Sequence, residues 1–290
     1  MSAAGTKDSA AFCADLVRAH DFERYASTLF VSADRRRALL ALYAFNFEIS
    51  RVRDQVSQPL PGEIRLQWWT DMLAGAGHGG VEGNPVAAEL LRAIRTYSLP
   101  VERLSRLIDE HQFDLYDDPM PSMAALEAYI YDTSSALFAL GTRIVGRQSE
   151  ATDHLARHAG FAEGLVRVIA KLPLDASRRQ LFVPLQLLES HGSGMEEVFA
   201  GKETPQLRAA LDQLIGEARG HLKTTFELLA SAPPELRPLF LPLALVRRDL
   251  KRRSRADCNP FTPQPTSRLR TLWTLWRASK TLVPRTQRSA

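Results

Sequence analysis

Two stretches of the chain carry aspartates at positions where they could bind a metal ion. Asp54 ends the first stretch, residues 43–54, and Asp175 ends the second, residues 160–175. Carboxylates four residues apart on facing helices can hold Mg²⁺ ions, and such ions can stabilise a negatively charged leaving group. The chemistry to consider is therefore metal-assisted catalysis.

Each stretch has only one of the two carboxylates that such a site needs. Ser50 lies four residues before Asp54, and Lys171 lies four residues before Asp175. An ammonium has no lone pair for Mg²⁺ and repels the ion at close range. Pro173 disfavours helix at the residue before it, so Lys171 and Asp175 need not face the same way. Asp54 and Asp175 remain as metal-ligand candidates, enough for one weakly held ion.

Positive side chains stand beside or within the same stretches: Arg51, Arg53, Arg167 and Lys171. Arginine binds phosphate in bidentate fashion, and lysine binds it as a point charge. A metal-free pocket for an isoprenoid phosphate or another lipid phosphate is one interpretation. In the other, Arg53 faces solvent while Arg51 and Arg167 pair with Glu48 or Glu163.

The elements that must position these residues are helices, because helical periodicity dominates and almost no segment alternates like a half-buried strand. Hydrophobic residues make up 45% and charged residues 24% of the 290 residues, which is typical of a globular protein with a large core. The breaks between helices are short, which indicates one all-α domain. Helices are predicted around 39–47, after 61–62, and at 85–97, 100–117, 123–146, 150–171, 178–190, 204–231, 233–255 and 266–281.

The cysteines and the N-terminus favour a cytoplasmic protein. Cys13 and Cys258 are too few for a disulfide framework and lack metal-ligand spacing. The first residues lack a signal peptide, and the acids Asp8 and Asp15 disfavour a mitochondrial presequence. No apolar run is long enough to span a bilayer. We expect a cytoplasmic protein, peripheral on the inner face of a bacterial inner membrane.

Positive charge gathers in residues 247–290. Such an end suits an anionic membrane surface, although a solvated helix face explains it equally well. Nucleic acid is a less favoured partner, because no recognised binding motif accompanies the charge.

The last predicted helix carries an apolar stripe at helical spacing: Leu269, Leu272, Trp273 and Trp276. Such a stripe could lie at a bilayer interface, with its indoles at headgroup depth. Packing of the stripe onto the body of the domain is slightly favoured.

His154 and His158 lie four residues apart on a predicted helix and could share one metal ion. No HExxH pattern accompanies them and no third ligand is obvious, so a surface or packing role is favoured.

Four landmarks in the same order and spacing resemble the squalene/phytoene synthase family over roughly residues 20–255. They are segment 37–45, segment 107–115, Tyr129 with the small pair Ser134-Ser135, and segment 160–162 with 177–184. The resemblance implies an isoprenoid synthase-type helical bundle around a central cavity. It also implies head-to-head condensation of two prenyl diphosphates with Mg²⁺.

Carried over to this chain, the acids of the first family motif fall on Ser50 and Asp54, and a usual arginine falls on Phe47. In the second motif a usual asparagine falls on Arg167, and the arginine-aspartate pair falls on Ala170-Lys171. The sequence singles out no catalytic residue. The candidate pocket comprises Tyr43, Phe47, Ser50, Arg51, Asp54, Tyr129, Arg167, Lys171 and Asp175.

Within the family, the chain most resembles the branch of mitochondrial complex I assembly factors that have a phytoene-synthase-like domain. Segments 44–49, 54–58, 64–69 and 177–184 carry this likeness, and that branch also lacks intact aspartate motifs. It implies a bacterial, catalytically degenerate relative that binds a lipid or complex I subunits and needs no cofactor. The alternative is an active Mg²⁺-dependent head-to-head prenyltransferase. The domain is expected over residues 20–283, after a tail or short helix at 1–19 and before a basic tail at 284–290.

Overall fold

The computed structural model describes residues 3–76, 83–146, 148–264 and 266–281, and the regular structure in these ranges is entirely helical. The predicted all-α class is therefore confirmed. The elements in chain order are α1 (Ala3–His20), α2 (Phe22–Thr28), α3 (Ala33–Ser50), η1 (Val52–Gln55), α4 (Pro59–Leu73), α5 (Pro85–Tyr97), α6 (Val101–Glu110), η2 (Phe113–Leu115), α7 (Met123–Ile130), η3 (Tyr131–Ser135), α8 (Ala136–Ile144), α9 (Glu150–Ser177), α10 (Leu185–Ser190), α11 (Met195–Phe199), α12 (Pro205–Ser231), η4 (Pro234–Phe240), α13 (Leu243–Arg253) and α14 (Arg268–Thr281).

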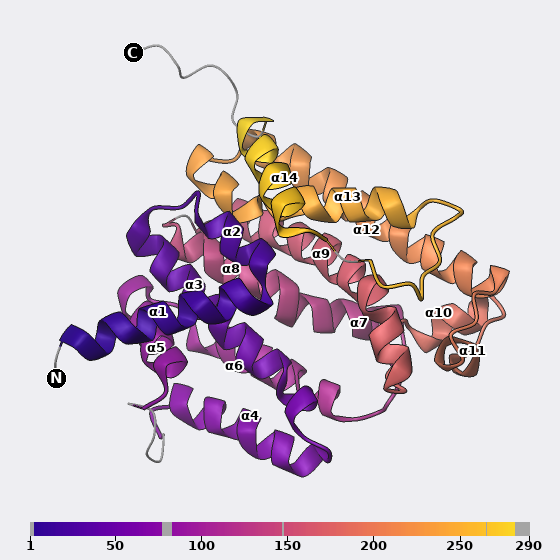
Figure 1. The fold of residues 1–290 in the computed structure, drawn as a ribbon, viewed down its shortest axis with the longest axis horizontal. Coiled ribbons are helices and arrows are strands. Elements are labelled where there is room, and N and C mark those ends of the chain that lie inside the picture. The colour runs from indigo at the N-terminus through magenta and orange to yellow at the C-terminus, as the bar shows by residue number, and fades with distance from the viewer. Residues whose placement is uncertain (1–2, 77–82, 147, 265, 282–290) are drawn as a thin grey trace.

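The long helix α9 lies at the centre of the bundle. Helix α12 packs along one side of it, and α8 and η3 pack along another. Figure 1 shows α12, α13 and α14 on one side of α9, with α1, α3 and α5 on the opposite side and α4 at the edge. The two stretches with candidate site residues are therefore carried by α3 with η1 and by α9.

Helix α9 begins with a capping box and continues through Pro173. The Ser149 hydroxyl accepts a hydrogen bond from the Thr152 N–H, and the Thr152 hydroxyl accepts one from the Ser149 N–H. Pro173 has no N–H for the carbonyl of Ile169, four residues earlier. Buried Arg253 of α13 donates to that carbonyl instead, at 3.4 Å.

Pro173 left it open from the sequence whether Lys171 and Asp175 face the same way, and in the structure they do. Helix α9 is unbroken from Glu150 to Ser177, and the Lys171 Nζ lies 3.8 Å from the Asp175 Oδ1. The carbonyl that proline would leave without a donor is satisfied from another helix, so the two side chains share one face.

A close approach at Gly160 places η3, which is a short π-helix, directly against α9. A Cβ at Gly160 would lie 2.2 Å from the Cα of Ser135, so only glycine fits there. The Ser135 hydroxyl also donates to the carbonyl of Arg157 at 3.1 Å. This contact sets the position of the wall formed by α7 and η3.

Helix α1 covers most of residues 1–19, which were expected as a tail or short helix. It packs against α3 and α5, and its side chains Cys13 and Val17 are buried. The expected basic tail at 284–290 lies outside the described residues.

The predicted helix at 178–190 is irregular as far as Pro184 and becomes helical only at α10. Arg179 has a φ of 56°, in the left-handed region, which ends the helical path after α9.

Helix α14 packs through the face opposite to the one expected. Thr271, Leu275 and Ala278 are buried against residues of α2 and α13 and the segment before α13. The residues of the predicted apolar stripe are exposed instead: Leu269 (79%), Leu272 (37%), Trp273 (56%) and Trp276 (53%). The favoured packing of this stripe onto the domain is therefore wrong.

Candidate functional site

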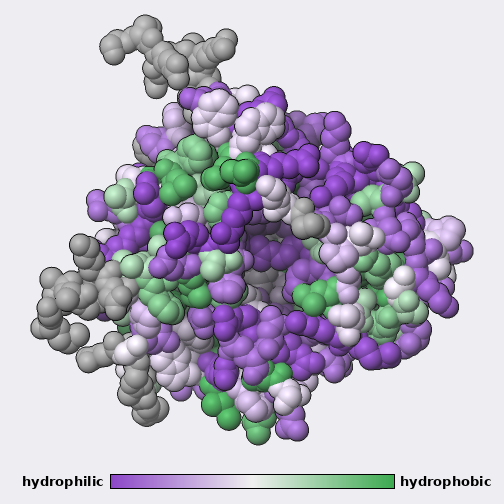
Figure 2. Space-filling view, in the orientation of Figure 1, coloured by the Kyte–Doolittle hydropathy of each residue, from purple (hydrophilic) through white to green (hydrophobic). Residues whose placement is uncertain are grey.

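A cavity of about 50 Å³ lies between α9, α3, the end of α6, and the wall formed by α7, η3 and α8. Its polar lining includes Asn46, His111, Tyr129, Arg167, Lys171 and Asp175, and Phe182 and Val168 are among its apolar side chains. Figure 2 shows a hollow near the centre of the molecular face seen in Figure 1, with both hydrophilic and hydrophobic residues along its rim. A cavity of this size has room for a few water molecules or a small polar group.

The candidate residues divide into two groups. Tyr129, Arg167, Lys171 and Asp175 line the cavity together. The remaining five are not among its lining residues and belong to contacts around α2, α3 and η1: Tyr43, Phe47, Ser50, Arg51 and Asp54.

Asp175 is a buried carboxylate with an unsatisfied oxygen. It is 3% exposed, and its Oδ1 has no hydrogen-bond partner among the described residues, because Lys171 at 3.8 Å is within ion-pair range only. Burial raises the pKa of Asp175 to about 6, the charge of Asp114 adds to this rise, and Lys171 opposes it. The cavity thus contains an acid that takes up a proton close to neutral pH.

His111 and Tyr129 are both held by Asp114. The His111 Nδ1 lies 2.7 Å from one carboxylate oxygen of Asp114, and the Tyr129 hydroxyl donates to the other at 2.9 Å. Burial and the neighbouring Asp114 raise the pKa of Tyr129. The His111 Nε2 is buried and has no hydrogen-bond partner among the described residues.

Sequence reasoning did not select His111, Asp114 or Asn46 as site residues. His111 and Asp114 belong to segment 107–115, and their three-residue spacing is the signal that could have singled them out. Asn46 is three residues after Tyr43 on α3, and no local pattern indicates its place in the cavity.

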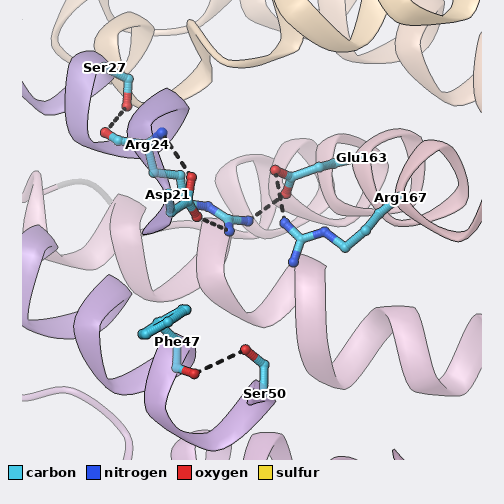
Figure 3. A network of polar contacts seen from close by, with 7 residues as sticks. All are labelled: Asp21, Arg24, Ser27, Phe47, Ser50, Glu163 and Arg167. Atoms are coloured by element: carbon cyan, nitrogen blue, oxygen red, sulfur yellow. Dashed lines mark hydrogen bonds and ion pairs between the residues drawn. The ribbon is translucent and has the colours of Figure 1, made fainter. Parts of the chain in front are cut away.

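A second group of polar residues forms an ion-pair network of Asp21, Arg24, Glu163 and Arg167, shown in Figure 3. Arg24 is 4% exposed, and its guanidinium donates to Asp21 at 3.0 Å and to Glu163 at 2.7 Å. Arg167 reaches the other oxygen of Glu163 at 3.4 Å. Burial opposes the charge of Arg24, but Glu163 and Asp21 more than offset it, so its pKa is raised.

Tyr43 contacts this network through Arg24. The guanidinium of Arg24 is 5.4 Å from the centre of the Tyr43 ring. Burial raises the pKa of the Tyr43 hydroxyl, and the charge of Arg24 opposes the rise. Arg24 was not selected from the sequence because it precedes both stretches.

Phe47 and Ser50 lie on α3 near the same network (Figure 3), and the side chains of both make contacts within the protein. The Phe47 ring stacks on His20 with centroids 4.4 Å apart, and Arg51 lies 5.0 Å from the Phe47 ring centre. The Ser50 hydroxyl donates to the carbonyl of Phe47 at 3.2 Å. The position of the first family acid is thus occupied by a hydroxyl that bonds its own helix.

Asp54 lies beyond the end of α3, in η1, and forms an ion pair with Arg178. The neighbouring Arg53 is not free in solvent, since it pairs with Asp117 at 2.8 Å and its side chain is 21% exposed. Of the two ion pairs left open from the sequence, Arg167 with Glu163 is present.

These residues do not fit the metal clamp that the fold family uses. Mg²⁺ requires several oxygen ligands in near-octahedral geometry, whereas Asp54 is taken up by Arg178 and Asp175 is buried beside Lys171. In the described ranges no three acidic, histidine or cysteine side chains converge as a metal site needs. We therefore derive no metal-dependent step for this chain.

His154 and His158 gain a third imidazole from α12. The His158 Nδ1 lies 2.9 Å from the His221 Nδ1, and the His154 and His158 rings are 4.7 Å apart. Phe161 stacks on His221 with centroids 4.9 Å apart. In this arrangement His158 and His221 bond each other across the α9–α12 contact.

The curated relatives of the chain include complex I assembly factors. The sequence is 32% identical over 262 residues to "NADH dehydrogenase (ubiquinone) complex I, assembly factor 6" of Rattus norvegicus, covering 90% of this chain and 79% of the relative. It is 30% identical over 252 residues to the Homo sapiens protein of the same name, covering 87% and 76%. Phytoene synthase of Thermus thermophilus is 26% identical over 245 residues, covering 79% and 81%.

Solved structures share the fold at low identity. A dehydrosqualene synthase in complex with ligand superposes with a TM-score of 0.79 at 14% identity, covering 96% of this chain and 97% of the other. Squalene synthase HpnC from Alicyclobacillus acidocaldarius gives 0.74 at 19% identity, covering 86% and 94%. The family model for squalene/phytoene synthase matches residues 17–277. The chain therefore belongs to the squalene/phytoene synthase family.

Proposed function

We propose that this protein assists the assembly of respiratory complex I and does so without metal-dependent prenyl transfer. The observation that carries the proposal is the pairing of acids with the protein's own cations around the site. Asp54 pairs with Arg178, Asp175 lies beside Lys171, and Glu163 is shared by Arg24 and Arg167. Carboxylates neutralised in this way are poor ligands for a cluster of Mg²⁺ ions.

The relatives supply the choice of process. The assembly factors reach 30% to 32% identity over most of both chains, compared with 26% for the phytoene synthase. These relatives are named for complex I, so complex I is the partner we propose for this chain.

We further propose that the cavity receives the phosphate-bearing end of an isoprenoid or another lipid. Two half-exposed cations of α9 line it, since the side chain of Arg167 is 41% exposed and that of Lys171 is 49% exposed. These charges can hold a phosphate directly. At about 50 Å³ the cavity admits a small group, and a lipid chain would need the walls of α7 and α9 to separate.

The experiment is a deletion of the gene in its native strain, followed by native gel electrophoresis of complex I and measurement of NADH:quinone reductase activity. We expect assembled complex I and its activity to fall, and wild-type protein to restore both. Arg167→Glu with Lys171→Glu should fail to restore them. The control Lys223→Glu changes a 79%-exposed lysine on α12 and should restore assembly fully. Normal complex I in the deletion strain would contradict the proposal.

An active head-to-head prenyltransferase is the second candidate. Tyr43, Asp54 and Asp175 are retained, and the fold superposes on a dehydrosqualene synthase with a TM-score of 0.79. The purified protein would be incubated with farnesyl or geranylgeranyl diphosphate and Mg²⁺ or Mn²⁺. We expect no diphosphate release, and robust release with a condensed product would establish the second candidate in place of the first.

The proposed role includes peripheral contact with an anionic membrane. The basic part of the chain from residue 247 onward supplies charge for such contact. No helix in the described ranges is both long and apolar enough to cross a bilayer.

A further inference from the structure

Helix α14 has two opposite faces, and both are apolar in part. The inner face packs against a small cluster that includes Ala26, Leu241 and Leu245. The outer face carries the exposed stripe Leu269, Leu272, Trp273 and Trp276. Since helical residues three and four apart share a face, this stripe is one continuous surface about two turns long.

The stripe is accompanied by cations and by no acid. Helix α14 contains Arg268, Arg270, Arg277 and Lys280 but neither Asp nor Glu. The Arg277 guanidinium lies 4.8 Å from the centre of the Trp273 ring, and the Lys280 Nζ lies 5.6 Å from that of Trp276. Among the described residues, none of the four cations forms an ion pair with an acid. Arg268 turns back to the protein, where it donates to the carbonyl of Arg18 at 3.4 Å and lies 4.9 Å from the centre of the Phe22 ring. Arg277 and Lys280 lie against the exposed indoles instead, so their charge faces outward.

This combination matches a bilayer surface better than a protein surface. Indoles and leucines can enter the boundary between headgroups and acyl chains while neighbouring cations meet anionic headgroups. A stable contact between two proteins needs about 800 Å² on each partner, which is more than four side chains on two helical turns provide. Figure 1 shows α14 near the top of the molecule, beside α13.

We propose that α14 is a membrane-docking helix that lies flat on an anionic bilayer, with Trp273 and Trp276 at the headgroup boundary and Arg277 and Lys280 on anionic lipid. This inference gives a place to the membrane contact in the proposed function, but it rests on the exposed face of α14 alone. The helix stays packed on α2 and α13 through Thr271, Leu275 and Ala278, so docking requires no unfolding.

The test is cosedimentation of the purified full-length protein with vesicles of phosphatidylcholine alone and of phosphatidylcholine mixed with phosphatidylglycerol. We expect binding to the mixed vesicles that weakens at high salt and little binding to phosphatidylcholine alone. Trp273→Ser with Trp276→Ser should abolish binding. Arg277→Glu with Lys280→Glu should weaken it by more than about tenfold, because each cation near an anionic surface strengthens binding several-fold.

The matched control is Leu60→Ser with Ile64→Ser, which removes two exposed apolar side chains of α4 (64% and 63%) and should leave binding unchanged. Circular dichroism and thermal unfolding establish that each variant is folded. Absence of wild-type binding to mixed vesicles, or tryptophan variants that bind like wild type, would overturn the proposal. A dimer in light scattering that the tryptophan variants convert to monomer would instead assign the stripe to a second copy. None of these outcomes depends on complex I, so the two proposals fail separately.

Discussion

Arg24 of α2 donates a hydrogen bond to Glu163 of α9 at 2.7 Å, and this buried ion pair joins two segments 139 residues apart in the sequence. Asp21 and Arg167 complete the network, which then contains two acids and two cations. Charges balanced inside the protein need no bound metal ion for neutrality. The region between α2, α3 and α9 is therefore stabilised by the chain itself.

Breaking this network from one side should be costly. Arg24→Met leaves the carboxylates of Glu163 and Asp21 without the cation that they share. We expect a loss of about 3–5 kcal/mol in the free energy of unfolding, measured with urea. The double variant Arg24→Met with Glu163→Leu should recover part of this loss.

The control for that experiment is Arg18→Met on α1. Arg18 pairs with Asp15 at the surface, where the two side chains are 55% and 67% exposed. Its removal should change stability by no more than about 1 kcal/mol. Equal losses of unfolding free energy for Arg18→Met and Arg24→Met would show that the buried network stabilises the protein no more than a surface ion pair does.

Asp175 should make the protein less stable as pH rises. Its pKa is about 6 in the folded protein against an ordinary value of 3.8, so the folded state holds the proton more tightly. The stabilising contribution of protonated Asp175 is fully present below about pH 4 and is lost as pH rises through about pH 6. Asp175→Asn should therefore be more stable than wild type above that range by about 2 to 3 kcal/mol, at roughly 1.4 kcal/mol per pKa unit. The readout is the variant-minus-wild-type difference in unfolding free energy across pH, and a flat difference would refute the assignment.

The pair of His158 and His221 should make the protein less stable as pH falls, which is the opposite of the effect of Asp175. Burial lowers the pKa of both; the charges of His154 and Arg157 lower that of His158 further, while Glu217 and Glu127 oppose the fall at His221. The unfolded chain therefore binds protons first, and the contribution of the pair is lost as pH falls below about 6.5.

His221→Phe keeps an aromatic ring against Phe161 but removes the titratable group at position 221. We expect the unfolding free energy of this variant to change less than that of wild type between about pH 7 and pH 5. His191→Asn, outside the cluster, serves as the control and should follow wild type. The same pH response in wild type and His221→Phe would remove the pair as its source.

Gly160→Ala should destabilise the fold, because its Cβ would meet the backbone of Ser135 at 2.2 Å and push α9 away from η3. We expect a loss of at least about 1–3 kcal/mol in thermal or urea unfolding. Gly216→Ala on α12 meets nothing within 4 Å and should stabilise by up to about 1 kcal/mol. Loss of stability in both variants alike would mean that close packing at Gly160 is not the cause.

The helical class and several elements follow from sequence patterns alone. The predicted helices at 85–97 and 204–231 agree with α5 and α12 to within a residue, because Asn84 and Thr204 cap them and proline occupies their first position. The shared face of Arg167 and Lys171 was also predictable, since they lie four residues apart on the helix predicted at 150–171. The place of Asp175 beside them was not, because Pro173 indicated a helix that ends before it.

Other features depend on contacts distant in the sequence. From the sequence alone, a single arginine such as Arg24 is predicted to be a surface charge. Only the folded chain places it against Glu163. The stripe of α14 has the spacing of a core-facing surface, yet the smaller residues opposite it make the contact with α2 and α13. Local rules assign a helix its faces but not the neighbour that covers them.

The bond from Arg253 to the carbonyl of Ile169 links residues 84 positions apart. Because Pro173 cannot supply the missing donor, the last turn of α9, which carries Asp175, depends for its stability on α13. During synthesis on the ribosome, α13 emerges well after α9. We therefore expect the Asp175 end of the cavity to be among the last parts of the protein to become ordered.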